Sequence, residues 1–193
     1  DEVIVSMLLT DEDVVLPESI DKAIVRLALG VFTREFDFSR LRIKVKRWKS
    51  LGFLKWEASD LATLRMLKAL GITDITADWT LYAFNSEALS ALSDLGVRRF
   101  VASPENGREN LQALRESGYD VEFLSQQSTP LFISLTRPES ESQGEKIEFF
   151  EDNGKSLVVS KRGKLWITTR KVPRTFFVPQ GASSRVDLSW DLD

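Results

Sequence analysis

The sequence predicts an α/β fold. We expect a partial or modified TIM-like (β/α) barrel over residues 1–138, and over residues 139–193 a linker, a small antiparallel β segment and a tail. The main observation is a weak repeat punctuated by Gly52, Gly71, Gly96 and Gly118, which lie 19 to 25 residues apart. Each interval contains an apolar run, a polar junction and an amphipathic helical pattern. With no dinucleotide-binding fingerprint, the series favours a barrel segment over a Rossmann sheet, and three or four units indicate an incomplete barrel.

The repeat also places the expected helices. Each helical pattern ends at a glycine, which suits the left-handed residue that follows a helix. Ser59 or Asp60 is expected to cap the first helix. Ser86 and Asn106 are expected caps of the next two, and capping by Asn85 is also possible at the start of the second. Strands are expected over residues 100–102 and 121–124. The apolar stripes at helical spacing are Leu61, Leu64, Met66, Leu67 and Leu70, then Leu89, Leu92 and Leu95, then Leu111 and Leu114.

The two ends of the chain follow other patterns. Residues 3–9 predict a strand, and residues 23–29 fit a strand or a helix. Residues 37–52 alternate like a strand but also fit a helix, which we prefer because Gly52 ends the segment as the later glycines do. After the polar linker PESESQGE, three strands are expected, with turns at residues 152–154 and 162–163. The tail ASSRVDLSWDLD is expected to be loosely ordered or to pair with a neighbouring segment.

Composition removes several classes of function. The net charge of −3 predicts no general affinity for nucleic acid or anionic membranes, and we expect no membrane partner. No apolar run approaches a membrane span and no signal peptide precedes the chain, so we expect a cytoplasmic protein. The chain contains no Cys and no His, which excludes thiol nucleophiles, Ser-His-Asp catalysis and metal sites built on these residues. The first residue is Asp1, which indicates a piece of a longer protein.

Candidate site residues lie where a strand is followed by its helix, because parallel β/α folds gather function at the carboxyl ends of their strands. Glu57, Asp78 and Glu105 are the carboxylates at these junctions. They could act as acid/base groups or hold a hard metal ion, although ordinary helix capping explains many polar junction residues. Asp78 stands out because it ends an apolar strand and precedes the aromatic junction WTLYAF.

A basic segment follows in the second part of the chain. Between Lys155 and Arg174 there are seven basic residues and no acidic one, around Trp166. Such a segment could contact RNA, or it could be an ordinary solvated strand face. The turn at residues 152–154 lacks the later ligands of a calcium loop.

Three stretches in order resemble the collagenase-like peptidase family (class U, unknown mechanism, family 32): WEASDLATLRMLKALGI, ADWTLYAFNSEALSALSDLGVRRFVASPE and STPLFIS. The resemblance covers residues 46–138, about half of the chain, and implies a modified TIM-like barrel. It implies peptidase activity without an assigned mechanism, with Asp78, Glu105 and Glu57 as the catalytic candidates. The motif positions that carry over are Asp78, Leu81, Asn85, Ser103, Pro104 and Glu105, with residues 130–134 as the last strand motif; Asn85, Ser103 and Tyr82 are the substrate-binding candidates.

The chain departs from the family at its last motif. A cysteine usually follows it, where this chain has Leu135-Thr136-Arg137, and Gln127-Ser128 replaces a common Gly-Arg. Other members hydroxylate RNA or quinones through a cysteine-held iron–sulfur cluster, which here requires cysteines outside this chain. Three hypotheses follow: a collagenase-like peptidase, active or degenerate; a non-catalytic module that binds a peptide, another small ligand or RNA; or a fragment of an iron–sulfur-dependent hydroxylase. We expect no cofactor and no metal on this chain alone.

Overall fold

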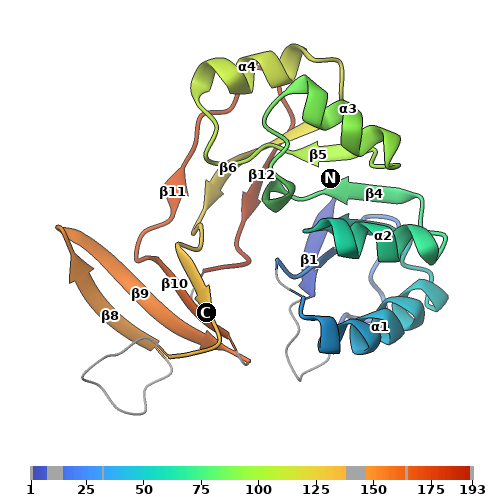
Figure 1. Cartoon of the computed structure of the whole chain (residues 1–193), viewed down its shortest axis with the longest axis horizontal. Coiled ribbons are helices and arrows are strands. Elements are labelled where there is room, and N and C mark those ends of the chain that lie inside the picture. Colours follow the sequence, from blue (N-terminus) through green and yellow to red (C-terminus); the bar gives the residue numbers. More distant parts are fainter. Residues whose placement is uncertain (1, 8–14, 32, 138–146, 164, 192–193) are drawn as a thin grey trace. The chain divides into compact units, whose positions relative to one another are not determined.

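The computed structural model describes residues 2–7, 15–31, 33–137, 147–163 and 165–191 (Figure 1). The chain divides into two compact units. The first unit comprises Asp1–Phe123 and Val178–Ser183, and the second comprises Leu124–Phe177 and Ser184–Asp193. Most of the parallel sheet belongs to the first unit, and a small antiparallel sheet belongs to the second.

The first unit is built on a parallel sheet whose strands lie side by side in chain order. They are β1 (Val3–Met7), β2 (Val25–Leu29), β3 (Lys55–Ala58), β4 (Asp74–Ala77), β5 (Arg99–Val101) and the start of β6 (Val121–Gln127). The sheet is curled into a half-barrel (Figure 1). The predicted α/β class is confirmed, and residues 23–29 contribute a strand rather than a helix. Within the described residues the strands do not close into a complete barrel.

From β2 to β6, helices connect the successive strands and cover one face of this sheet. They are α1 (Phe38–Ser50), α2 (Leu61–Ala69), α3 (Ser86–Asp94) and α4 (Arg108–Glu116), with short 3-10 helices η1 (Glu35–Asp37) and η2 (Trp79–Leu81). Crossovers between parallel strands are nearly always right-handed, which places successive helices on the same side of a sheet. The register aligns Leu27, Trp56 and Ile75 on that side, where all three are buried. The helical interpretation of residues 37–52 is confirmed by α1.

Glycines end the helices as the repeat predicts. Gly71 and Gly96 follow α2 and α3 with φ angles of 69° and 90°, in the left-handed region where a Cβ is strained. A Cβ at either position would lie 3.4 Å from a lysine side chain, that of Lys49 at Gly71 and that of Lys68 at Gly96. A side chain at either position would therefore strain the backbone and crowd a neighbouring lysine.

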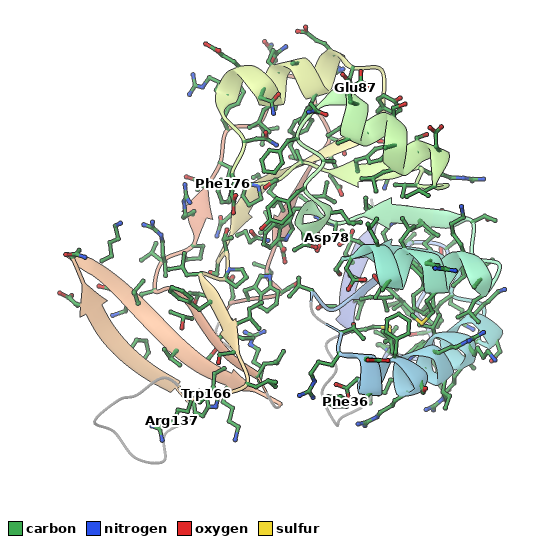
Figure 2. The ribbon with its side chains drawn as sticks, viewed as in Figure 1. Phe36, Asp78, Glu87, Arg137, Trp166 and Phe176 are labelled. Carbon is green, nitrogen blue, oxygen red and sulfur yellow. The ribbon has the colours of Figure 1, made fainter. Side chains whose placement is uncertain are left out.

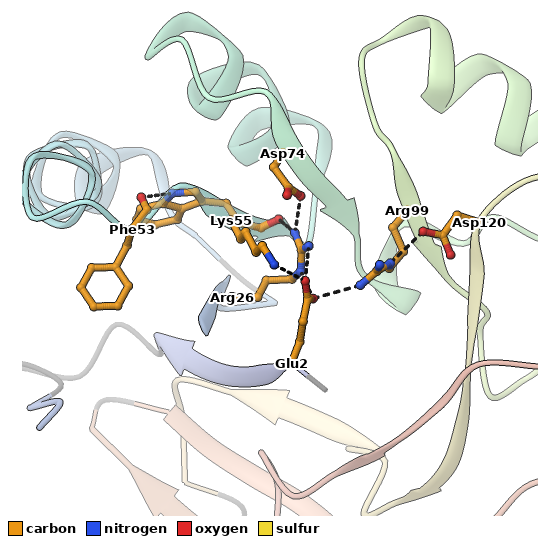
Figure 3. A network of polar contacts seen from close by, with 8 residues as sticks. Glu2, Arg26, Phe53, Lys55, Asp74, Arg99 and Asp120 are labelled. Atoms are coloured by element: carbon orange, nitrogen blue, oxygen red, sulfur yellow. Dashed lines mark hydrogen bonds and ion pairs between the residues drawn. The ribbon is translucent and has the colours of Figure 1, made fainter. Parts of the chain in front are cut away.

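The opposite face of the sheet carries charged side chains near the amino-terminal ends of the strands. Arg26, Lys55 and Asp74 are aligned by the register, and all three point away from the helices. The carboxylate of Glu2 lies 3.1 Å from Arg26 Nε, 2.6 Å from Lys55 Nζ and 2.9 Å from Arg99 Nη1 (Figure 3). Arg26, which is 3% exposed, also contacts Asp74 at 2.9 Å, and Arg99 contacts Asp120 at 3.0 Å. This network joins the amino-terminal ends of the parallel strands.

The second unit contains an antiparallel sheet in the order β7-β10-β9-β8. Its strands are β7 (Phe132–Ser134), β8 (Ile147–Asp152), β9 (Lys155–Arg162) and β10 (Leu165–Arg170). The three predicted C-terminal strands and the turn between β8 and β9 are confirmed, with Asn153 and Gly154 at φ angles of 49° and 73°. Residues 132–134, expected as a barrel strand, pair instead with β10 in this small sheet.

The tail of the chain is more ordered than the sequence predicts. β11 (Arg174–Thr175) and β12 (Ser184–Asp187) both pair with β6. The Gln127 side-chain amide donates to Asp187 at 2.6 Å, and the Ser125 hydroxyl donates to the carbonyl of Arg185 at 2.9 Å. Trp190 is buried. Of the two alternatives for the tail, pairing with a neighbouring segment is confirmed by β12.

Candidate functional site

The candidate site lies on the helix-free face of the half-barrel, where β3 and β4 run side by side. The register pairs Glu57 with Thr76, so their side chains point to the same face as neighbours. Both are buried, with Glu57 3% and Thr76 0% exposed. Within the described part of the chain, the Thr76 hydroxyl has no hydrogen-bond partner. A buried hydroxyl without a partner costs free energy, so a group that binds it would be favoured there.

Asp78 extends this face towards the carboxyl end of β4 (Figure 2). Its backbone N–H donates to the carbonyl of Ala58 at 2.9 Å, which continues the parallel pairing by one residue. Its side chain is 7% exposed and accepts from the backbone N–H of Trp79 at 2.7 Å, and the Thr80 hydroxyl lies 3.4 Å from its other oxygen. The bond from Trp79 makes Asp78 the N-cap of η2, a structural role for the carboxylate that the aromatic junction made prominent.

Hydroxyl groups join the strand ends around Asp78. The Thr80 hydroxyl donates to the carbonyl of Ser59 at 2.7 Å, and the Ser59 hydroxyl donates to the carbonyl of Leu29. The carboxyl ends of β2, β3 and β4 are thus linked in sequence. Ser59 is therefore a strand-end connector, and Asp60 alone caps α2, in a capping box with Thr63.

The remaining candidates lie on the loops after β4 and β5. Ser103 is buried and its hydroxyl accepts from the backbone N–H of Glu105 at 3.3 Å, whereas Glu105 itself is exposed. Tyr82 is exposed, has a left-handed φ of 51° and stacks on Phe84 with a centroid distance of 5.5 Å. Asn85 caps α3 by accepting from the N–H of Ala88 at 2.9 Å. The strands therefore bring Glu57, Thr76 and Asp78 onto one face, and the other candidates occupy loop positions.

Two predicted caps are corrected. Ser86 is the first residue of α3 and not its cap, because the side chain of the preceding Asn85 takes that role. The N-cap of α4 is Gly107, which has no side chain to donate or accept. Asn106 instead accepts a hydrogen bond from the side chain of Asn110 in the next turn.

The described residues provide no set of side chains suited to binding a metal ion. In the ranges that the structure describes, no group of three or more Asp or Glu side chains is placed to hold a metal ion. A single buried carboxylate such as that of Glu57 can still accept a proton or a hydrogen bond.

Sequence reasoning missed two polar features of the first unit. Thr76 lies two residues before Asp78, and the period of two along a strand puts both on one face. The Glu2 network was signalled by a charged residue at the first position of β3, β4 and β5 and at the second position of β2. Burial alone would raise the pKa of the Glu2 carboxyl, but hydrogen bonds from Lys55 and Arg26 and the nearby Arg99 outweigh it and lower that pKa to about 2. Burial opposes the charge of Arg99 too, yet Asp120 and Glu2 raise its pKa.

The basic segment of the second unit is largely engaged with its own unit. Lys161 and Arg137 lie over the ring of Trp166, at 5.5 and 5.4 Å from its centroid. Arg162 donates to the carbonyl of Ser189 at 2.5 Å. Lys161 and Arg162 are therefore engaged within the described part of their own unit, and RNA contact by this segment stays a prediction.

Comparison with known proteins identifies no relative that supports the resemblance. No protein-family model, curated protein or solved structure matches this chain. Among the described residues, no helix is both long and apolar enough to cross a membrane. The collagenase-like resemblance therefore rests on the three motif stretches alone, and the geometry of the site is the remaining guide to function.

Proposed function

We propose that this chain is a collagenase-like peptidase domain whose site lies on the helix-free face of the half-barrel. One observation carries the proposal: buried Glu57 and buried Thr76 are neighbours on adjacent strands, and the Thr76 hydroxyl has no hydrogen-bond partner in the described structure. Buried polar groups usually have partners, and the exceptions gather at functional sites. A peptide group, with one donor and one acceptor, matches this pair.

Glu57 is the general base of the proposed reaction. Its carboxylate takes a proton from a water molecule while the water oxygen attacks the carbonyl carbon of the peptide. The Thr76 hydroxyl donates to the carbonyl oxygen, on which negative charge develops. The C–N bond then breaks, and the proton passes from Glu57 to the leaving amine. Burial supports these roles because electrostatic interactions are stronger away from water.

Asp78 is a positioning residue in this proposal. Its carboxylate accepts from the backbone N–H of Trp79, which fixes the turn after β4. Glu105 is exposed on the loop after β5, and its role in this proposal is to contact substrate rather than to move a proton. Tyr82, Asn85 and Ser103 complete the proposed binding loops.

The test is turnover of a peptide panel, with denatured collagen included, followed by mass spectrometry. We expect Glu57→Gln to lower kcat at least about 100-fold, since loss of a general base costs 10²–10⁴ in rate. Glu105→Gln is the matched control, being the same substitution at an exposed carboxylate, and we expect a change of only a few-fold. Absence of turnover by the unaltered chain would contradict the peptidase proposal.

The second candidate is a non-catalytic module that binds a peptide or another small ligand at the same face. It is favoured by Asp78, whose carboxylate already serves as the N-cap of η2. This candidate predicts that a ligand raises the thermal unfolding temperature without being converted. It also predicts that Thr76→Val reduces this rise. Conversion of the stabilising ligand would decide for the peptidase.

A further inference from the structure

Positive charge is concentrated on two neighbouring helices of the first unit. Between Phe38 and Lys55 there are seven basic residues and no acidic one, although the whole chain has a net charge of −3. Six of them are in α1, and α2 adds two more basic residues and no acidic one. In contrast, α3 and α4 together hold four acidic and two basic residues. The basic residues of the first pair are Arg40, Arg42, Lys44, Lys46, Arg47, Lys49, Arg65 and Lys68.

The outer side of α1 combines these cations with exposed apolar side chains. Leu41 and Val45 are buried, so the opposite side of the helix faces outward. Ile43 lies at the centre of that side and is 68% exposed, between the exposed Arg42 and Lys46. Phe36, seven residues before Ile43, is 70% exposed (Figure 2).

The two basic helices meet at their carboxyl ends. The ammonium group of Lys49 in α1 donates to the carbonyl of Leu70, the C-cap of α2, at 2.5 Å. Arg65 and Lys68 are exposed on α2. We define the basic face as Arg42, Ile43 and Lys46 of α1.

We propose that the basic face binds the surface of an anionic lipid bilayer. Clusters of Lys and Arg are attracted to anionic headgroups, and exposed apolar side chains can enter the boundary between headgroups and acyl chains. A helix of 13 residues is about 20 Å long, and α1 can lie flat along such a surface. This inference is independent of the proposed peptidase site, which lies on the other face of the sheet.

The exposed apolar side chains favour a bilayer over the phosphate backbone of a nucleic acid. Ile43 gains nothing from a phosphodiester, whereas burial in an apolar boundary is favourable. The ring of Phe36 would offer a base a stacking surface, but Arg34 already lies 4.1 Å from its centroid. The net charge of the chain predicted no membrane partner. That prediction sums charges over the whole chain, whereas a bilayer senses mainly the charges within a Debye length of about 10 Å of its surface.

The test is co-sedimentation of the 193-residue chain with two kinds of vesicle: phosphatidylcholine alone, and phosphatidylcholine with about one third phosphatidylserine. We expect binding to the mixed vesicles only, weakening as salt rises. Arg42→Gln with Lys46→Gln should lower this binding at least tenfold, because each cation near the surface contributes about 1 kcal/mol. Ile43→Ser, which changes no charge, should lower it several-fold.

Matched controls make the outcome decisive. Arg115→Gln with Lys155→Gln removes two exposed cations elsewhere, and we expect its binding to equal that of the unaltered chain. Circular dichroism checks that the variants fold. Equal binding to both vesicle types, no binding, or full binding by the Arg42/Lys46 variant would each overturn the proposal. The proposal would also be overturned if the chain bound a 20-nucleotide RNA more tightly than the mixed vesicles, with this RNA binding abolished by Arg42→Gln with Lys46→Gln and unchanged by Ile43→Ser.

Discussion

Two buried threonines in the first unit differ in whether the side-chain hydroxyl has a hydrogen-bond partner. Thr63 and Thr76 are both fully buried. The Thr63 hydroxyl donates to the carbonyl of Asp60 at 2.9 Å and accepts from its N–H at 3.2 Å, whereas the Thr76 hydroxyl is without a partner in the described residues. The first hydroxyl contributes to the stability of the fold through these bonds, whereas the second makes no such bond in the described residues.

Threonine-to-valine substitutions at these two positions should therefore have opposite signs. Thr76→Val replaces an unpaired hydroxyl by a methyl group of the same shape, and we expect it to raise the free energy of unfolding by about 1 kcal/mol. Thr63→Val breaks the capping box and should lower it by about 1 kcal/mol. Urea unfolding measures both. A loss of stability in Thr76→Val similar to that in Thr63→Val would mean that Thr76 is a structural hydroxyl.

The same position shows where sequence reasoning stopped at the residue scale. Asp78 was recognisable as a charged group ending an apolar strand, but its partners Trp79 and Thr80 depend on the turn that follows. Thr76 gave no signal of its own, because Thr is common in strands whether or not its hydroxyl is paired. Knowing that it faces Glu57 requires the register between β3 and β4, which is a non-local property.

At the scale of elements, the glycine-ended helices were predictable and their first residues were less so. Asp60 was an expected cap and is one, whereas Asn85 takes the place expected for Ser86. Asn and Ser are both good capping residues, and only the backbone geometry decides which of the two neighbours, Asn85 or Ser86, is the cap. β7 was assigned to the barrel because residues 130–134 match the last strand motif of the resemblance. It pairs instead with β10, whose residues lie far away in sequence.

Alanine substitutions at the caps test this assignment. Asp60→Ala and Asn85→Ala should each lower the free energy of unfolding by about 1 kcal/mol, because each leaves a backbone N–H of the first helical turn without its acceptor. Ser86→Ala is the neighbouring control and should change stability by less than about 0.5 kcal/mol. Urea denaturation of the three variants measures this. Equal losses in Asn85→Ala and Ser86→Ala would contradict the cap at Asn85.

At the scale of the whole molecule, the first unit has ion pairs at the amino-terminal ends of its strands and hydroxyl-to-carbonyl hydrogen bonds at the carboxyl ends. The Glu2 network joins the amino-terminal ends through ion pairs with Arg26, Lys55 and Arg99. Its cations and carboxylates come from segments up to 97 residues apart. Composition and periodicity indicated the curled sheet and its helices, but such long-range pairs, like the charge difference between helices, appear only when the segments are assembled.

The lowered pKa of Glu2 gives the fold a defined response to acid. The carboxyl has a pKa of about 2 when folded against 4.5 without its partners, so the folded state binds fewer protons. The resulting stability is present above pH 4.5 and is lost as the pH falls towards 2; it amounts to on the order of 1 kcal/mol, because solvent screens this partly exposed group. Urea unfolding of the unaltered chain and of Glu2→Gln between about pH 7 and pH 2 measures it. Their difference should shrink across this interval; a constant difference would contradict the role of the charge.

The central claim is that Glu57, beside Thr76 on the helix-free face of the half-barrel, is the functional carboxylate of this chain. The most direct measurement is kcat/KM for the best substrate of the peptide panel, compared among the unaltered chain, Glu57→Gln and Glu105→Gln, with thermal unfolding recorded for each. We predict a loss of at least about 100-fold for Glu57→Gln with an unfolding temperature near that of the unaltered chain, and little change for Glu105→Gln. Unchanged kcat/KM in a folded Glu57→Gln, or a loss confined to Glu105→Gln, would contradict the claim.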